Sequence, residues 1–343
     1  NTKTEETIFS NLALQRVASL DWSPLYLDYL AVGGNTGNLA GRVIVINTLS
    51  NQIQYSLESG ESVSSTAWSP DGTKIAATSN IVGTPITSRN EVRVWDAGTG
   101  ELLTNLLFSI GPITSIAWSP SGQQIVGATT DHVTLIWDVA TGAVIHTLTG
   151  HTDVVMSVTW SSDGSQLATT GSVLDNTVRI WNADTGENIS TFPSRFGIVR
   201  WNAVDNLLAI GEGGSLRLLD AGTGKELGSF QLNAASRAFA YSPYGGRLSL
   251  ADSPLSTHTL ENAVQTLAGG AVRIVVPAPS LERLQAIADA CSAPAAVEQS
   301  LTADIQAGQL TDFVAQVEAL PEGVIPPACA ADLIVVAEAL QSR

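Results

Sequence analysis

Basic residues are scarce in this chain. Its 343 residues include 16 Lys and Arg against 32 Asp and Glu, so the formal net charge is −16 at pH 7. Sequence-independent nucleic-acid binding depends on basic side chains that neutralise phosphates, and no basic stripe is present. Like-charge repulsion also disfavours an anionic membrane surface. The charge balance therefore argues against nucleic-acid and anionic lipid partners.

Long apolar runs and methionine are also lacking. A membrane-spanning helix needs about 20 consecutive apolar residues, and the sequence has no such run. The sequence begins at Asn1, and its single methionine is Met156. Because translation starts with methionine, we expect a processed chain. Removal of a secretory signal is the simplest cause, and truncation of a longer polypeptide is the alternative.

Cysteine occurs only twice, as Cys291 and Cys329. We expect them to form a disulfide, which would close a loop of about 40 residues and stabilise the fold by about 4 kcal/mol. Two buried thiols are the alternative. A disulfide indicates an oxidising compartment, extracellular or periplasmic, and free thiols would favour the cytoplasm.

Eight tryptophans are present, and all of them occupy two positions of one repeated unit. The first position recurs after 46, 50, 42, 41 and 40 residues and holds Trp22, Trp68, Trp118, Trp160, Trp201 and Tyr241. The second position stands before Asp or Asn and holds Trp95, Trp137 and Trp181. A period of this size indicates one supersecondary unit copied along the chain.

Each copy has the pattern of four short antiparallel strands. The alternating run that ends at the first aromatic, as in residues 155–160, predicts a strand with one buried face. A Ser-Pro-Asp-Gly turn at residues 69–72 leads to the second strand, because Pro presets φ and Gly accepts positive φ. The second tryptophan marks the third strand, and a Thr-Gly turn such as Thr141-Gly142 precedes a short fourth strand.

This pattern resembles the WD40-repeat (WD-repeat) β-propeller family over about residues 5–276. The resemblance implies an all-β, WD40-type β-propeller with six blades, and a reduced seventh blade is the alternative. Segments 8–14 and 272–276 are left over, and they could complete a blade shared between the two chain ends. We therefore predict two domains, a propeller over residues 1–277 and an α-helical domain over residues 278–343.

The fourth copy matches the family most closely, with Gly150-His151 before its first strand. In the family, a His, a hydroxyl residue of the second strand, an Asp and the Trp form a buried network. The resemblance implies that His151, Thr170 (or Thr169), Asp175 and Trp181 form this network here. Other copies depart from it, so we interpret these residues as structural rather than catalytic.

The last 60 or so residues have helical spacing of apolar residues. Leu281, Leu284, Ile287, Ala288 and Cys291 would lie on one face of a first helix. A second helix would end at Gly308, Thr311 would cap a third, and residues 328–340 would form a fourth. A bundle of this size has a marginal core of its own.

Motifs that carry chemistry are missing from the sequence. The four histidines are His132, His146, His151 and His258, and none has metal-ligand spacing to another His or Cys. Neither a phosphate-binding loop nor a nucleophile elbow is present. We therefore expect no catalytic residue, no metal and no cofactor.

Binding of a protein partner is the expected function, as a non-catalytic interaction scaffold or accessory subunit. The alternatives are a partner-sensing propeller end of a longer intracellular signalling protein and a hydrolase or lyase with a site in the central channel. Loops on a rigid scaffold usually carry recognition, and two adjacent copies have enlarged second-to-third loops. The candidate binding residues in these loops are Asn35, Thr36, Asn38, Asn80, Ile81, Val82, Ile86 and Arg89.

Overall fold

A computed structural model describes most of residues 16–231 and parts of the remainder. Within 16–231 the gaps are 25–28, 37–39, 48–51, 61, 81–89, 109–110, 196, 203–205 and 213. Beyond this range it describes four strands between residues 239 and 275 and some residues from Leu284 to Ala337; before it, Leu14 is described. The chain divides into two compact units, Asn1–Gly197 and Ile198–Arg343.

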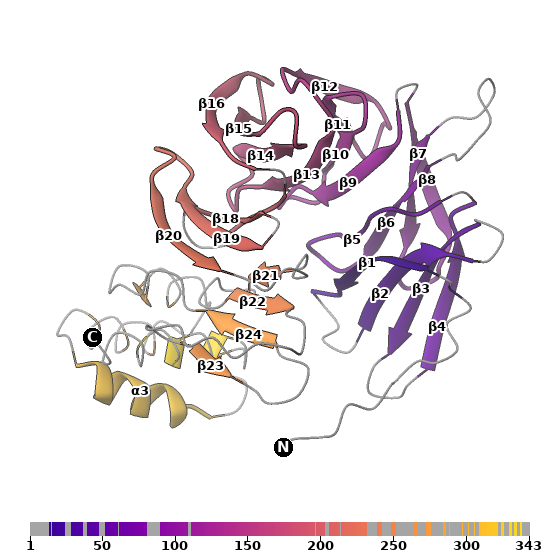
Figure 1. Ribbon diagram of the computed structural model, residues 1–343. Coiled ribbons are helices and arrows are strands. Elements are labelled where there is room, and N and C mark those ends of the chain that lie inside the picture. The colour runs from indigo at the N-terminus through magenta and orange to yellow at the C-terminus, as the bar shows by residue number, and fades with distance from the viewer. Residues whose placement is uncertain are drawn as a thin grey trace. The chain divides into compact units, whose positions relative to one another are not determined.

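The first unit consists of four antiparallel four-stranded sheets (Figure 1). The sheets are β1 (Arg16–Trp22), β2 (Tyr29–Asn35), β3 (Gly41–Asn47) and β4 (Gln52–Glu58); β5 (Thr66–Trp68), β6 (Lys74–Ser79), β7 (Glu91–Asp96) and β8 (Leu102–Leu107); β9 (Ile113–Trp118), β10 (Gln124–Thr129), β11 (Val133–Asp138) and β12 (Val144–Thr149); β13 (Val155–Trp160), β14 (Gln166–Gly171), β15 (Thr177–Asn182) and β16 (Asn188–Pro193). Each sheet keeps its strands in sequence order.

The second unit adds two sheets and a helical segment. Its elements are β17 (Ile198–Trp201), β18 (Leu207–Glu212), β19 (Ser215–Asp220) and β20 (Glu226–Gln231); β21 (Phe239–Tyr241), β22 (Leu248–Ala251), β23 (Val264–Thr266) and β24 (Val272–Val275); and α3 (Leu310–Glu318). All six sheets are antiparallel and four-stranded, as the WD40-type β-propeller class requires.

Turn chemistry explains the strand ends. At the turn after β5, the N–H of Gly72 donates to the Ser69 carbonyl at 2.8 Å, and Gly72 has φ of 67°. The Asp71 carboxylate accepts the N–H of Thr73 at 3.0 Å. Burial alone would raise the pKa of Asp71, but hydrogen bonds from Ser69 and Thr73 prevail and lower the pKa to about 2. The predicted turns therefore lie where their sequence places them.

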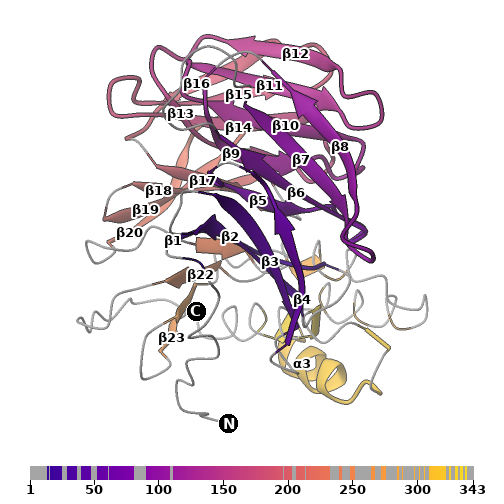
Figure 2. The same ribbon diagram turned by 90° about the vertical axis from the view of Figure 1, so that its right-hand side faces the viewer.

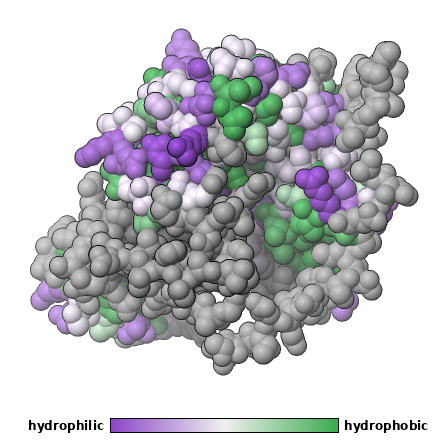
Figure 3. All heavy atoms as spheres, viewed as in Figure 1, coloured by the Kyte–Doolittle hydropathy of each residue, from purple (hydrophilic) through white to green (hydrophobic). Residues whose placement is uncertain are grey.

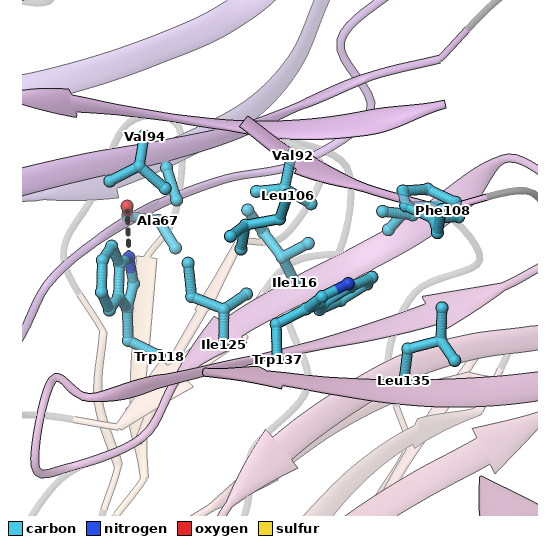
Figure 4. Packing of buried hydrophobic residues seen from close by; sticks show 12 residues of the cluster. Ala67, Val92, Val94, Leu106, Phe108, Ile116, Trp118, Ile125, Leu135 and Trp137 are labelled. Atoms are coloured by element: carbon cyan, nitrogen blue, oxygen red, sulfur yellow. Dashed lines mark hydrogen bonds between the residues drawn. The ribbon is translucent and has the colours of Figure 1, made fainter. Parts of the chain in front are cut away.

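Neighbouring sheets of the first unit join through the first-strand tryptophans. The indole N–H of Trp118 donates to the carbonyl of Ala67 at 3.1 Å (Figure 4). Trp68 makes the same bond to Asp21 at 3.1 Å, and Trp160 makes it to Ala117 at 3.2 Å. Each acceptor directly precedes the aromatic of the preceding copy. The second and third sheets, side by side in Figure 2, also share one apolar core. The repeat thus forms the same tryptophan hydrogen bond between neighbouring sheets three times.

The sixth sheet has the order β21-β22-β24-β23. The apolar run at residues 272–276 is therefore not left over, because β24 pairs with both β22 and β23. Among the described residues, every sheet draws its four strands from one continuous stretch of chain. The idea of a blade completed by both ends finds no support in that part of the chain. Segment 8–14 lies outside the described residues except for Leu14.

The C-terminal residues pack around a separate apolar cluster. Residues in all four expected helical segments are helical, including Leu284, Leu301 and Leu333, and they cluster with Phe313 of α3. The cap prediction at Thr311 is wrong, because α3 begins at Leu310 after an N-cap at Gln309. No helix among the described residues has the length and apolar character needed to span a membrane. The domain boundary at residue 277 stays a prediction.

Candidate functional site

The third and fourth sheets bring three loops together at one end. These are the β10–β11 loop (residues 130–132), the β12–β13 loop (residues 150–154) and the β14–β15 loop (residues 172–176), and we name them the loop face. Nε2 of His132 lies 3.9 Å from Oδ1 of Asp153. The hydroxyl of Ser172 donates to the same carboxylate, Asp153. Contacts between side chains therefore hold the loops as one surface.

The network around His151 forms the base of the loop face. The Trp181 indole N–H donates to the hydroxyl of Thr169 at 2.8 Å, and that hydroxyl lies 2.7 Å from Nε2 of His151. Nδ1 of His151 lies 2.9 Å from Oδ1 of Asp175. Because a carboxylate only accepts hydrogen bonds, Nδ1 carries the proton and Thr169 donates to Nε2. The chain of donors thus runs from Trp181 through Thr169 and His151 to Asp175.

Thr170 is not part of this network, which corrects the residue expected from the resemblance. Successive side chains of a strand point to opposite faces, and the Thr170 hydroxyl donates instead to the carbonyl of Gly197 at 2.6 Å. Thr169 takes the place of Thr170 beside His151. Sequence alone could not choose between two adjacent threonines, because the choice depends on which face of β14 meets the tryptophan.

Burial and hydrogen bonding shift both ionisable groups of the network. Burial lowers the pKa of His151, and its contact with Asp175 only partly opposes that effect. For Asp175 burial acts to raise the pKa, but hydrogen bonds from Thr177, Thr152 and His151 outweigh it and hold the pKa well below its usual range. His151 is therefore neutral and Asp175 ionised, and the carboxylate accepts the backbone N–H of Thr152 at 2.6 Å.

The third sheet replaces this polar network by apolar packing. Phe108 lies against Trp137 with ring centroids 5.4 Å apart, close to the 6.2 Å between His151 and Trp181. Gly127 stands where β14 has Thr169, and a Cβ there would lie 2.7 Å from the Trp137 ring. The indole N–H of Trp137 is buried without a hydrogen-bond partner among the described residues. These replacements support a structural role for the network.

Asn35 and Asn80, two of the candidate binding residues, are buried ties between sheets. Oδ1 of Asn35 accepts the N–H of Val63 at 2.9 Å. Oδ1 of Asn80 accepts the N–H of Ile113 at 2.9 Å, and its amide group donates to the Ile113 carbonyl at 2.7 Å. Their amides are engaged where the next sheet begins, so these two residues are not available to a partner.

The other candidate loop residues remain open. Thr36 is partly exposed, and its hydroxyl donates to the carbonyl of Ala40 at 3.3 Å. Asn38, Ile81, Val82, Ile86 and Arg89 lie outside the described residues. Cys329 is fully buried in the C-terminal cluster. Cys291 is not among the described residues, so their disulfide stays a prediction.

Two exposed aliphatic residues were not among the residues expected to bind. Val173 and Leu174 form the tip of the β14–β15 loop, with 52% and 80% of their surface exposed. The signal was present in the sequence as an apolar pair inside a loop between Ser172 and Asp175. Loop length does not reveal this pair, because the β14–β15 loop is short.

The contacts of one further histidine and the arrangement of possible metal ligands concern the described residues alone. Nε2 of His146 lies 2.8 Å from the carbonyl of Asp184, and His258 lies outside the described residues. In the part of the chain that the structure describes, no group of three or more His, Cys, Asp and Glu is placed to hold a metal ion.

Two comparisons with known proteins identify the repeat. The family model "WD domain, G-beta repeat" matches residues 104–138 and 142–182. "Meiotic fizzy-related protein 1" of Schizosaccharomyces pombe is 29% identical over 115 residues, which is 34% of this chain and 25% of that protein. "SIR4-interacting protein SIF2" of Saccharomyces cerevisiae is 29% identical over 139 residues, 36% of this chain and 24% of that protein.

The matches cover part of each protein. The chain spans about a quarter of the length of these curated relatives. The two matched repeats run from β8 to β11 and from the turn before β12 to β15, so they cross from one sheet to the next. Residues 104–138 and 142–182 of this chain therefore match WD40 repeats, and the antiparallel four-stranded sheets have the architecture of a WD40-type β-propeller.

Proposed function

We propose that this protein is a non-catalytic scaffold that binds a protein partner through the loops between second and third strands. The observation that carries the proposal is a fixed frame with variable loops. The same tryptophan hydrogen bond joins successive sheets of the first unit. The loops between second and third strands differ in length, from the short loop at residues 130–132 to the long loop at residues 80–90. Rigid sheets that present unlike loops are suited to recognition.

Similarity to known proteins supports binding as the function. One relative is named for its interaction with SIR4, and it shares WD40 repeats with this chain. The net charge of −16 favours a partner with a basic surface, because complementary charge speeds association. The test therefore changes a loop of this chain and measures which protein is retained.

Replacement of residues 81–89 by a short Gly-Ser linker tests the proposal. The enlarged loop would be lost while Asn80, the tie at its base, would remain. A matched control replaces residues 140–141, in the β11–β12 turn at the other end of the sheets. We expect purified wild type and control to retain the same protein from an extract of the source organism, and the loop variant to lose it. Equal retention by all three would contradict a role for this loop.

We propose further that the protein is exported and that Cys291 and Cys329 form a disulfide. Burial of Cys329 in the C-terminal cluster supports a structural role for this cysteine, and disulfides persist in oxidising compartments. Intact mass before and after reduction, on protein isolated from its source, distinguishes a bridge from two thiols. Two alkylated thiols without prior reduction would favour the cytoplasmic alternative.

A further inference from the structure

The tip of the β14–β15 loop is an exposed aliphatic pair on an otherwise polar loop face. Leu174 is 80% exposed and Val173 is 52% exposed. Figure 3 shows a small hydrophobic patch among polar residues near the top of the visible face, over the area of β14 and β15 in Figure 1. The corresponding β10–β11 loop is Thr130-Asp131-His132 and has a polar tip. The fourth sheet therefore has an apolar loop tip that the third sheet lacks.

Hydrogen bonds hold this loop in one conformation. The N–H groups of Asp175 and Asn176 both donate to the Ser172 carbonyl, at 3.1 and 2.9 Å. The side-chain amide of Asn176 donates to the Val173 carbonyl at 2.6 Å. Asn176 also has φ of 53°, a left-handed conformation that Asn tolerates. The backbone of the loop cannot move inward without breaking these bonds.

The base of the loop is equally fixed. Asp175 belongs to the buried chain that ends at Trp181, and Ser172 donates to Asp153 of the adjacent loop. A loop whose backbone is held in place in the free protein loses little conformational entropy on binding. The buried polar network thus supports the backbone that carries two exposed aliphatic residues.

Acidic groups beside the tip indicate the partner's chemistry. On the loop face, Asp153 lies beside His132, and Asp131 is the neighbour of His132 in the chain. The carboxylate of Asp131 accepts the N–H of Gly111 at 2.8 Å. A matching surface has an apolar pocket with Lys or Arg beside it.

We propose that Leu174 and Val173 are the anchor of the partner interface and insert into an apolar pocket of a protein with that charge pattern. This inference rests on the proposed function, since it names the surface and the partner's chemistry for the same binding activity. A few side chains seated in well-packed, desolvated pockets carry most of the binding energy of many interfaces. Removal of Leu174 should therefore weaken binding far more than removal of an aliphatic residue elsewhere.

The test places a photo-crosslinking amino acid at position 174 of the full chain, in an extract of the source organism. A second chain carries it at Leu103, a half-exposed residue of the outer strand β8. The cross-linked protein is then purified, and its affinity is measured for wild type, Leu174→Ser and Leu103→Ser. We expect cross-linking from position 174 alone, a loss of affinity of about 10- to 100-fold for Leu174→Ser, and no change for Leu103→Ser.

Each other outcome overturns a stated part. A partner that binds Leu174→Ser as tightly as wild type sinks the anchor and leaves the proposed function standing. Absence of any protein retained by wild type sinks both. Leu174-dependent sedimentation with phosphatidylcholine vesicles would assign the tip to a lipid surface and overturn the protein pocket. Thermal unfolding of each variant confirms the fold, since exposed positions usually change stability little.

Discussion

Thr169 and Thr170 are neighbours on β14, yet their hydroxyl groups serve different joints. Thr169 connects Trp181 to His151 inside the fourth sheet, whereas Thr170 donates to Gly197 at the start of the next copy. The two positions give a matched pair of residues for measuring what the network contributes. Predictions for His151, Asp175 and Gly127 likewise follow from the contacts of each residue.

Thr169→Val should lower the free energy of unfolding by about 2–3 kcal/mol, because it leaves two buried groups without a hydrogen-bond partner. Thr170→Val removes one hydrogen bond and should cost about 1 kcal/mol. Urea unfolding of the two variants measures the difference. Equal losses of unfolding free energy would show that the His151 network contributes no more to stability than a single hydrogen bond.

Acidification should destabilise the protein in two steps. His151 has a lowered pKa in the fold, so below about pH 6.5 the unfolded chain binds a proton that the folded chain resists. Asp175 also has a lowered pKa, so its stabilising contribution is present above about pH 4 and is lost as the pH falls further. Stability from both groups is thus complete at neutral pH. In unfolding curves between pH 8 and 5, the variant His151→Gln should show a flatter profile than wild type, and parallel profiles would refute the assignment.

Gly127→Ala should destabilise the third sheet, although alanine is usually preferred over glycine within a strand. The added Cβ would lie 2.7 and 2.9 Å from two atoms of the Trp137 ring, which packs against Phe108. Such overpacking costs about 1–3 kcal/mol. A melting temperature at or above that of wild type would show that the ring moves aside freely.

At the scale of elements, the six sheets differ less in their strands than in what joins them. First strands end in an aromatic residue whose indole N–H reaches the preceding sheet in three cases. Third-strand tryptophans pack in the apolar clusters between neighbouring sheets, and the indole N–H of Trp137 has no hydrogen-bond partner among the described residues. Tryptophans at the two repeat positions therefore differ in their hydrogen bonds.

Phenylalanine substitutions separate these two kinds of tryptophan. Trp118→Phe loses ring volume and the bond to Ala67, whereas Trp137→Phe loses ring volume and a donor that had no partner. We expect Trp118→Phe to cost about 1–2 kcal/mol more than Trp137→Phe. Chemical denaturation monitored by circular dichroism gives both values. The reverse order would show that packing around Trp137 outweighs the lost hydrogen bond.

At the scale of the whole molecule, two kinds of core follow one another along the chain. The sheets share apolar clusters between neighbours, as in the second and third sheets. The C-terminal helical residues have a separate cluster around Phe313, Leu333 and Cys329. This second core is small, so a covalent link would matter more to it than to the sheets.

Reduction should therefore destabilise the C-terminal cluster if Cys291 and Cys329 are joined. A loop of about 40 residues contributes about 4 kcal/mol when closed by a disulfide. We expect dithiothreitol to lower the melting temperature of wild type and to have no effect on the double variant Cys291→Ser/Cys329→Ser. An unchanged melting temperature for wild type on reduction would favour two thiols.

Much of the fold followed from the sequence, whereas less of the candidate site did. The aromatic spacing predicted the strand ends, and the Ser-Pro-Asp-Gly pattern predicted turns such as residues 69–72, because both depend on residues close in sequence. The sequence did not indicate that Asn35 and Asn80 are buried, because their amides meet partners 28 and 33 residues away. Loop length does not indicate the exposure of Leu174, because that residue lies in a short loop.

The sequence by itself determined the repeat and the class of fold, because the period of about 40 residues can be read directly from the chain. It also determined the turn positions, because these depend on the backbone preferences of neighbouring residues. Only the tertiary structure decided that Thr169 rather than Thr170 meets His151, that Phe108 replaces a histidine beside Trp137, and that β24 lies between β22 and β23. Each of these depends on which face of a strand packs against residues distant in the chain, and that choice is made by packing and hydrogen bonding across sheets.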